Sequence, residues 1–320
     1  MVELAPTRHD RSATPWVIAL SVATLLAPLL ARQTPGGIAD PAASRHRPPA
    51  TVLTAIELAD GTTLLADHVT PLPDGGVEVL HAGVQRRLGK EALAPETPKP
   101  QMYLLGTDRL GRDLLARLLH GWRNSLGIAG LAALACLLAG ALIGLVAAYS
   151  GGMIDRWTMR LVDVSMALPK LFVLLAIAAT QDPGPLLLVL LLAAVSWMSV
   201  ARLVRARALA LRGAEFTEAA RASGCSAGRI LFHHYLPHLR PLLVTLGLLQ
   251  FSSLILLEAA LSFLGAGLAP PTPSLGGLVA DAALRGSTSW WMVLFPGLAI
   301  ALASLTVRWI ASRSGDSAFS

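Results

Sequence analysis

Hydrophobic residues in this chain are concentrated in long runs that are separated by shorter polar segments. A helix rises about 1.5 Å per residue, so about 20 consecutive apolar residues cross the hydrocarbon core of a bilayer. The pattern therefore predicts an all-α polytopic membrane protein with six transmembrane helices. The predicted spans are residues 15–31, 125–149, 166–180, 186–200, 241–264 and 290–310.

The first apolar run allows two interpretations. Arg8 and Arg11 precede it, as basic residues do in a cleavable signal peptide. No clean small-x-small cleavage site follows it, which favours a retained span. Residues 1–31 are thus predicted to form a cytoplasmic N-terminus and the first transmembrane helix.

Residues 32–106 form a long polar insertion. Short β-prone runs alternate there with turn signals such as Asp60-Gly61 and Ala82-Gly83. The insertion is predicted to be a small β-rich periplasmic subdomain, and a loosely ordered loop is the alternative. The predicted strands are residues 51–58, 62–66, 77–81 and 84–88.

Residues 107–320 are predicted to hold the other five helices. Leucines recur at helical spacing over 107–122, which predicts an amphipathic helix in the membrane interface that leads into the span at 125. A helix packed on the insertion is the alternative. Residues 265–289 are rich in Pro and Gly and are predicted to be an outer loop.

Residues 201–240 are the most polar part of this core. Within them, residues 215–238 suit two short helices around a turn at Gly224, and Pro237 is predicted to end the second helix. The 40 residues hold seven arginines against two glutamates, which predicts a cytoplasmic location. Counting spans from this segment places both termini in the cytoplasm and the insertion outside.

Composition supports a membrane protein. The chain is 54% hydrophobic and 14% charged, whereas soluble domains carry about 25% charged residues. The net charge of +6 would suit nucleic acid, but the arginines lie beside apolar runs, so membrane lipid and no nucleic acid is expected as the partner. Cys136 lies in an apolar run and Cys225 in the polar segment, so no disulfide is expected.

No catalytic, nucleotide or metal site is predicted. Only Lys90 among the three lysines follows a glycine, and Glu91 comes after it, so no phosphate-binding P-loop is present. Hydrolase and zinc-protease motifs are absent. His233, His234 and His238 lack supporting ligands, so surface histidines are favoured over a metal site.

Two polar residues within the fifth predicted span are candidates for a translocation path. Glu258 is the one carboxylate well inside a span, and such residues tend to face a bundle interior or a water-filled path. A structural partner on the neighbouring loop is equally compatible. Gln250 is the second candidate, with an interhelical hydrogen bond as the alternative.

The polar segment resembles a known motif. Glu218-Ala219-Ala220, then Gly224 four positions later and Leu236-Pro237 before a span, are similar to the EAA loop of permease subunits of bacterial ABC importers. His238 stands where the family usually has an asparagine. Other stretches resemble the dipeptide, oligopeptide and nickel branch, the "C" permease subunits, over about residues 102–310. They include Leu105-Gly106-Thr107-Asp108, Gly111-Arg112-Asp113, Gly151-Gly152 with Asp155, Arg160 with Asp163, Arg202 with Arg205, and Glu258-Ala259-Ala260-Leu261-Ser262.

The resemblance implies a six-helix type I importer permease in the bacterial inner membrane. It implies a second permease subunit, in a heterodimer, around a central path, cytoplasmic ATPase subunits that bind ATP and magnesium, and a periplasmic solute-binding protein. No cofactor is expected in this chain itself. The residues expected to couple the permease to its ATPase are Glu218, Ala219, Ala220, Gly224, Leu236 and Pro237.

Other functions are less well supported. A membrane-embedded enzyme would need paired catalytic groups or metal ligands within its spans, and none are found. A channel or scaffold that docks a different cytoplasmic protein stays open as an alternative. The sequence does not name the substrate, although peptides come first and nickel second.

Overall fold

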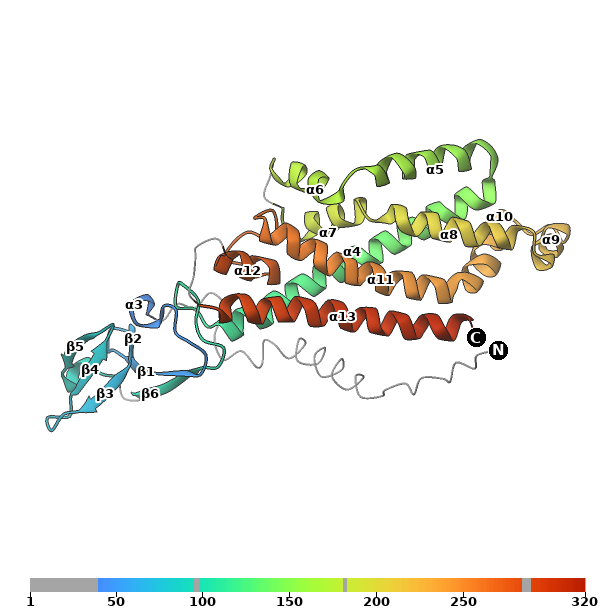
Figure 1. Ribbon diagram of the computed structural model, residues 1–320. Helices are drawn as coiled ribbons and strands as arrows, with labels where there is room; N and C mark the ends of the chain where they lie inside the picture. Colours follow the sequence, from blue (N-terminus) through green and yellow to red (C-terminus); the bar gives the residue numbers. More distant parts are fainter. Residues whose placement is uncertain (1–39, 95–97, 181–182, 284–288, 320) are drawn as a thin grey trace, which may run out of the picture.

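The computed structural model describes residues 40–94, 98–180, 183–283 and 289–319, so the predicted first span at 15–31 lies outside the described residues. Two small β-sheets lie at one end of the molecule, and a bundle of long helices extends away from them (Figure 1). The short helix α9 lies at the opposite end of the bundle (Figure 1).

The insertion contains two three-stranded antiparallel sheets. The strand order is β2-β1-β6 in the first and β3-β4-β5 in the second. Four of the strands match the predicted runs, whereas β3 and β6 were not predicted. The strands are β1 (Thr51–Glu57), β2 (Thr63–Ala66), β3 (His68–Pro71), β4 (Val77–His81), β5 (Val84–Leu88) and β6 (Lys99–Tyr103).

Each face of the first sheet is covered. Leu53, Leu65 and Tyr103 pack with Ala43 of α3 (Pro41–Ser44) on one face. On the other face, residues of β1 and β2 pack against β4 of the second sheet in a separate apolar cluster. The short 3₁₀ helix η2 (Lys90–Ala92) follows β5. The two clusters give this small unit its own core.

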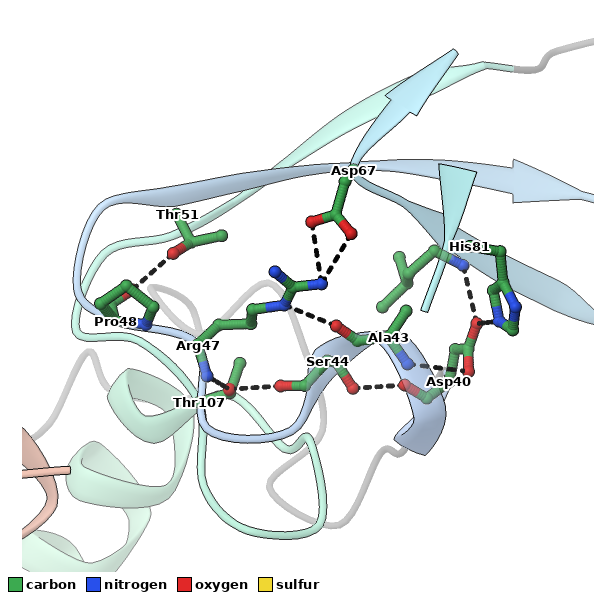
Figure 2. A network of polar contacts seen from close by, with 10 residues as sticks. Asp40, Ala43, Ser44, Arg47, Pro48, Thr51, Asp67, His81 and Thr107 are labelled. Atoms are coloured by element: carbon green, nitrogen blue, oxygen red, sulfur yellow. Dashed lines mark hydrogen bonds and ion pairs between the residues drawn. The ribbon is translucent and has the colours of Figure 1, made fainter. Parts of the chain in front are cut away.

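A polar network joins the insertion to the helical part (Figure 2). The Thr107 hydroxyl accepts a hydrogen bond from the Arg47 backbone N–H at 2.9 Å and donates one to the Ser44 carbonyl. The Arg47 guanidinium pairs with Asp67 at 2.8 Å. Trp291, at the start of the last helix, donates from Nε1 to the Thr107 carbonyl at 3.3 Å. The insertion is therefore bonded to the turn that precedes α4, and α13 bonds to the same turn.

The bundle begins with α4 (Leu114–Ser150), a single helix of 37 residues. The helix predicted over 107–122 begins later than predicted, at Leu114, and is continuous with the span that it was predicted to lead into. Residues 107–113 form a turn, and Asp113 caps α4 by accepting the Leu115 N–H at 3.0 Å. No helix-breaking proline occurs after that cap, so the helix runs without interruption through the predicted span.

The next two predicted spans are each broken. α5 (Gly152–Ala167) and α6 (Lys170–Ala178) meet at a bend of 78°, beside Pro169, which cannot donate a helical hydrogen bond. α7 (Pro185–Ala194) and α8 (Trp197–Arg212) meet at a bend of 43°. The predicted spans at 166–180 and 186–200 therefore differ from the helices found, and part of the segment predicted as a polar loop belongs to α8.

Two helices do surround Gly224, but the prediction that Pro237 ends the second was wrong. After α9 (Glu215–Ala222), the chain passes through α10 (Ala227–Arg229) and the π-helix η3 (Ile230–Tyr235) into α11 (Leu236–Phe263). The Leu236 N–H bonds to the Leu231 carbonyl, five residues back. Pro237 has no backbone N–H to donate. Because the turn that precedes it is a wider π-turn, the helix does not need that hydrogen bond and continues past Pro237.

The predicted outer loop at 265–289 contains an unpredicted helix, α12 (Leu275–Ala283). Its Leu278 and Ala282 pack with Leu114 of α4 and with Trp291 and Met292 of α13 (Trp291–Phe319). Nine residues were too few to stand out from a segment rich in Pro and Gly.

Three described helices, α4, α13 and the helix formed by α10, η3 and α11, are long and apolar enough to cross a membrane. The count rises to five if each bent pair is one span. α4 approaches α8 closely: a Cβ at Gly140 would lie 2.6 Å from Val200 Cβ, and one at Gly144 would lie 2.5 Å from the Ala201 carbonyl oxygen. These two glycines therefore allow the backbones of α4 and α8 to pack closely.

Candidate functional site

Helix α9 attaches to the bundle by one face. Thr217 is fully buried and donates from its hydroxyl to the Leu211 carbonyl at 2.7 Å, and Ala220 is buried in the apolar cluster formed with α4 and α8. Glu218 and Ala219 are exposed. Within the described part of the chain, the Glu218 carboxylate has no hydrogen bond or ion pair. The face of α9 away from the bundle therefore presents Glu218 and Ala219 outward.

The corner after α9 is a Schellman motif. The Gly224 N–H bonds to the Arg221 carbonyl and the Cys225 N–H to the Ala220 carbonyl, each at 3.0 Å. Gly224 has φ of +75°, a left-handed conformation that glycine adopts at little cost. The predicted turn at Gly224 is confirmed, and it directs the chain back toward the bundle.

Aromatic contacts hold α9 against its neighbours. Phe216 stacks on His238 of α11, with ring centroids 4.7 Å apart and planes 6° from parallel. His234 lies on the same aromatic cluster, with its centroid 6.4 Å from that of Phe216. The Arg221 guanidinium lies 5.6 Å from the ring centroid of Tyr149 of α4. These pairings could not be predicted from the sequence, because the partners are far apart along the chain.

The return segment is anchored from inside. Ile230 and Tyr235 are fully buried, Leu236 is partly buried and Pro237 is exposed. The six predicted coupling residues thus lie in one small region, but only some of them face outward. The exposed ones are Glu218, Ala219, Gly224 and Pro237.

Ion pairs connect α5 to α8. Arg205 donates to both carboxylate oxygens of Asp155, from Nη2 at 2.6 Å and from Nε. Arg202 pairs with Asp163. Bidentate arginine–carboxylate pairs fix the relative orientation of the two elements that carry them. These pairs account for four of the residues on which the family resemblance rests.

Gln250 and Glu258 lie on the same helix but contact different elements. The Gln250 side-chain amide donates to the Ser196 carbonyl at 3.1 Å and to the Ser199 hydroxyl at 2.6 Å, across the break between α7 and α8. The interhelical hydrogen bond expected as the alternative for Gln250 is therefore present.

Glu258 is fully buried. Its Oε1 accepts from the Ser262 hydroxyl at 2.7 Å, and its Oε2 has no partner among the described residues. Neighbouring Ala259 lies against α12, since a Cβ at Gly276 would come within 2.1 Å of the Ala259 carbonyl oxygen. The structure therefore places Glu258 in a tightly packed core rather than beside the coupling residues.

A second buried polar network was not predicted. Asp108 accepts from the N–H groups of Leu110 and Arg112 and pairs with Arg112 Nε at 2.6 Å and Arg117 Nη1 at 2.7 Å. Arg117 also reaches Asp281 of α12 at 3.1 Å. These two carboxylates and two guanidinium groups form a charge-balanced link between the turn before α4, α4 itself and α12.

Two of the clustered histidines, His234 and His238, make contacts with each other and with Phe216. Within the ranges that the structure describes, no group of three or more His, Cys, Asp or Glu side chains is placed to hold a metal ion. His238 instead bonds through Nδ1 to the His234 carbonyl at 2.7 Å and stacks on Phe216.

The chain is similar to known transport proteins. A family model described as the binding-protein-dependent transport system inner membrane component matches residues 140–315. The chain is 41% identical to the di/tripeptide transport system permease protein DppC of Pseudomonas aeruginosa over 206 residues, which is 64% of this chain and 68% of that protein. It is also 41% identical to a putative peptide transport system permease protein of Brucella suis over 215 residues, covering 67% and 72% of the two chains.

A solved structure gives the fold. The MetNI methionine ABC transporter, in an inward-facing conformation, matches with a TM-score of 0.53 at 20% identity, over 63% of this chain and 95% of that one. The matched relatives are transport permeases rather than enzymes. With a family model over more than half of its length and two relatives at 41% identity, the chain belongs to the inner membrane permease components of binding-protein-dependent ABC importers.

Proposed function

We propose that this chain is a permease subunit of an ATP-driven peptide importer in a bacterial inner membrane. A second, different permease subunit would complete the central path, and a periplasmic solute-binding protein would deliver the substrate. ATP and magnesium would be bound by separate ATPase subunits. The peptide substrate is supported by the names of the relatives from Pseudomonas aeruginosa and Brucella suis.

The observation that carries the proposal is the exposed face of α9. Glu218 and Ala219 point outward from a helix that is anchored through Thr217 and Ala220. Small exposed residues allow a partner to approach closely, and an unpaired carboxylate offers a partner for a basic side chain. We infer that α9 seats in a groove of the ATPase, and that closure of the ATPase pair moves α9 and switches the path between inward-open and outward-open states.

The same proposal gives a topology. The three long helices, the two bent pairs and the run at 15–31 would make six spans. α9 and the β-sheets lie at opposite ends of the bundle (Figure 1), so a cytoplasmic α9 would put the sheets in the periplasm. Both termini would then be cytoplasmic.

Gln250 and Glu258 are proposed to act on the path in different ways. Gln250 bonds to the break between α7 and α8, so its movement would change the bend of that span. Glu258 would act from within the packed core, where its carboxylate bonds to Ser262 one turn later on α11.

The coupling role can be tested by adding bulk to the exposed face. Ala219→Arg should leave the chain folded in the membrane, because the side chain is exposed, but should reduce ATPase co-purification and vanadate-sensitive ATP hydrolysis by about tenfold or more. Ala210→Arg, at an exposed position of α8, is the matched control. Normal ATPase binding and transport by Ala219→Arg would refute the proposal.

Two other functions are compatible with the same exposed residues of α9. If no ATPase co-purifies with the native chain, α9 docks another cytoplasmic protein and the chain is a channel or scaffold. If the complex hydrolyses ATP but imports nickel and not peptides, the coupling proposal stands and the substrate is different. Uptake of a labelled dipeptide and of nickel by the same reconstituted transporter separates these cases.

A further inference from the structure

A charged cleft lies between α5 and α8. Its volume is about 730 Å³, and it begins at Gly152, where α5 starts. Five charged residues line it: Asp155, Arg156, Arg160, Asp163 and Arg205. The coupling residues of α9 take no part in it.

The carboxylates of the cleft are already paired. Asp155 binds Arg205, and Asp163 binds Arg202. Arg156 and Arg160 are exposed, and neither has an ion pair or hydrogen bond to any described residue through its side chain. They are four positions apart on α5 and so lie on one face of the helix. Two uncompensated guanidinium groups therefore border the same cleft.

The start of α5 adds to this positive potential. Its N-cap is Gly151, which has no side chain to accept hydrogen bonds from the first turn. Unbonded N–H groups at a helix N-terminus attract anions, and Gly152 lines the cleft at that point. Guanidinium groups and backbone N–H groups together suit an oxyanion with several acceptor oxygens.

Hydrocarbon surface lies beside the cationic cleft. Met153, Ile154, Trp157 and Leu161 of α5 are all exposed, and Trp157 has a relative exposure of 64%. Exposed tryptophan and arginine together are typical of the membrane–water boundary, and an arginine-rich end is typical of the cytoplasmic leaflet. A ligand that offers both anionic oxygens and acyl chains is an anionic phospholipid.

We propose that the cleft between α5 and α8 binds the phosphate headgroup of an anionic phospholipid from the cytoplasmic leaflet. Arg156 and Arg160 hold the phosphate oxygens, and the acyl chains lie along the apolar residues of α5. The bound lipid fills the space beside the Asp155–Arg205 pair and so supports the packing of α5 on α8.

The test uses the purified transporter complex in a neutral detergent. Binding of phosphatidylglycerol, phosphatidylcholine and inorganic phosphate is measured by native mass spectrometry and by the shift in thermal unfolding temperature. The double variant R156Q/R160Q is compared with R240Q, which removes an exposed arginine of α11 from outside the cleft. We expect the double variant to lose phosphatidylglycerol affinity by about tenfold or more and R240Q to change it by less than about twofold.

Three other results would each overturn the proposal in a distinct way. Equal phosphatidylglycerol binding by the double variant and the native chain would place the lipid elsewhere. Tight binding of inorganic phosphate, with no gain from the acyl chains, would make the cleft a site for a soluble anion. Loss of the second permease subunit from the double variant, with lipid binding unchanged, would make the cleft a protein interface. A variant R156K/R160K that restores binding would separate the need for charge from a general loss of folding.

Discussion

At the scale of single residues, the corner after α9 depends on a backbone torsion rather than on space. Gly224 has φ of +75°, yet a Cβ built there would meet no atom within 4 Å. A side chain at this position is therefore strained by the left-handed conformation alone, which costs about 1–2 kcal/mol per residue. Gly213, at the other end of α9, also has open space but a φ of −95°.

Gly224→Ala and Gly224→Asp should therefore disturb the corner without removing the chain from the membrane. We expect membrane levels close to those of the native chain and a clear loss of ATPase binding and coupled transport, since the exposed face of α9 would turn away from its partner. Gly213→Ala is the matched control and should behave as the native chain does. If Gly224→Asp still binds the ATPase and transports normally, the coupling role of this corner is wrong.

Asp40 lies at the start of the described part of the insertion and bonds to several groups in a polar network (Figure 2). Its carboxylate accepts from the Leu65 N–H at 3.1 Å, contacts His81 Nε2 at 2.7 Å and caps α3. Burial raises the pKa of Asp40, but the hydrogen bonds from Leu65 and from His81 outweigh it, and the pKa is lowered below 3.8. The charged form is thus favoured in the folded insertion.

This lowered pKa predicts how the insertion responds to acid. A carboxyl whose pKa is lower when folded stabilises the fold above its unfolded pKa, and that stability is lost as the pH falls through the folded value. The protection factors of the β2 and β4 amides, which correct for the intrinsic pH dependence of hydrogen exchange, should therefore fall as the pH drops below about 4. Asp40→Asn should quicken exchange at neutral pH and flatten this acid dependence, whereas Asp67→Asn should keep it. An unchanged acid profile in Asp40→Asn would contradict the assignment.

At the scale of elements, α12 packs closely between α11 and α4. A Cβ at Gly276 would lie 2.1 Å from the Ala259 carbonyl oxygen of α11, which is backbone and has little freedom to move. The Leu275 N–H bonds to the Ser125 hydroxyl of α4 at 3.0 Å, and Asp281 pairs with Arg117 of α4. The position of α12 is thus fixed from two sides.

Gly276→Ala should displace α12 and destabilise the chain by about 1–3 kcal/mol, as overpacking does in a close-packed core. Gly277→Ala is the neighbouring control, because its Cβ would lie 3.0 Å from the Ser274 hydroxyl, a group that can rotate. Thermal unfolding of the purified transporter measures the difference. Equal unfolding temperatures for the two variants would show that α12 is not held in this way.

The sequence predicted those elements that depend on local chemistry. Long apolar runs identify helices, and a glycine between two helical segments identifies the corner at Gly224. It could not predict the bend between α7 and α8, where no proline marks the break, or the passage of α11 through Pro237, which depends on a π-turn. Pairings such as Arg205 with Asp155 join residues 50 positions apart, so only the fold brings them together.

At the scale of the whole molecule, the two polar regions occupy opposite ends of the helical bundle (Figure 1). The β-sheets and α9 would therefore face different compartments if the helices cross a membrane. The chain offers a reporter for this arrangement: Cys225 follows the corner after α9 and is partly exposed, while Cys136 is buried in the bundle.

Labelling of spheroplasts with a membrane-impermeant maleimide should distinguish the two ends. In a Cys136→Ser background, a cysteine introduced at Gln85, exposed on β5, should be labelled in intact spheroplasts, whereas Cys225 should be labelled only after permeabilisation. A second inner reporter, Arg229→Cys, covers the case in which an ATPase subunit shields Cys225. Labelling in denaturant gives the total thiol for each variant. If Cys225 or the cysteine at 229 reacts before permeabilisation while the cysteine at 85 does not, the orientation is reversed, and α9 cannot couple to a cytoplasmic ATPase.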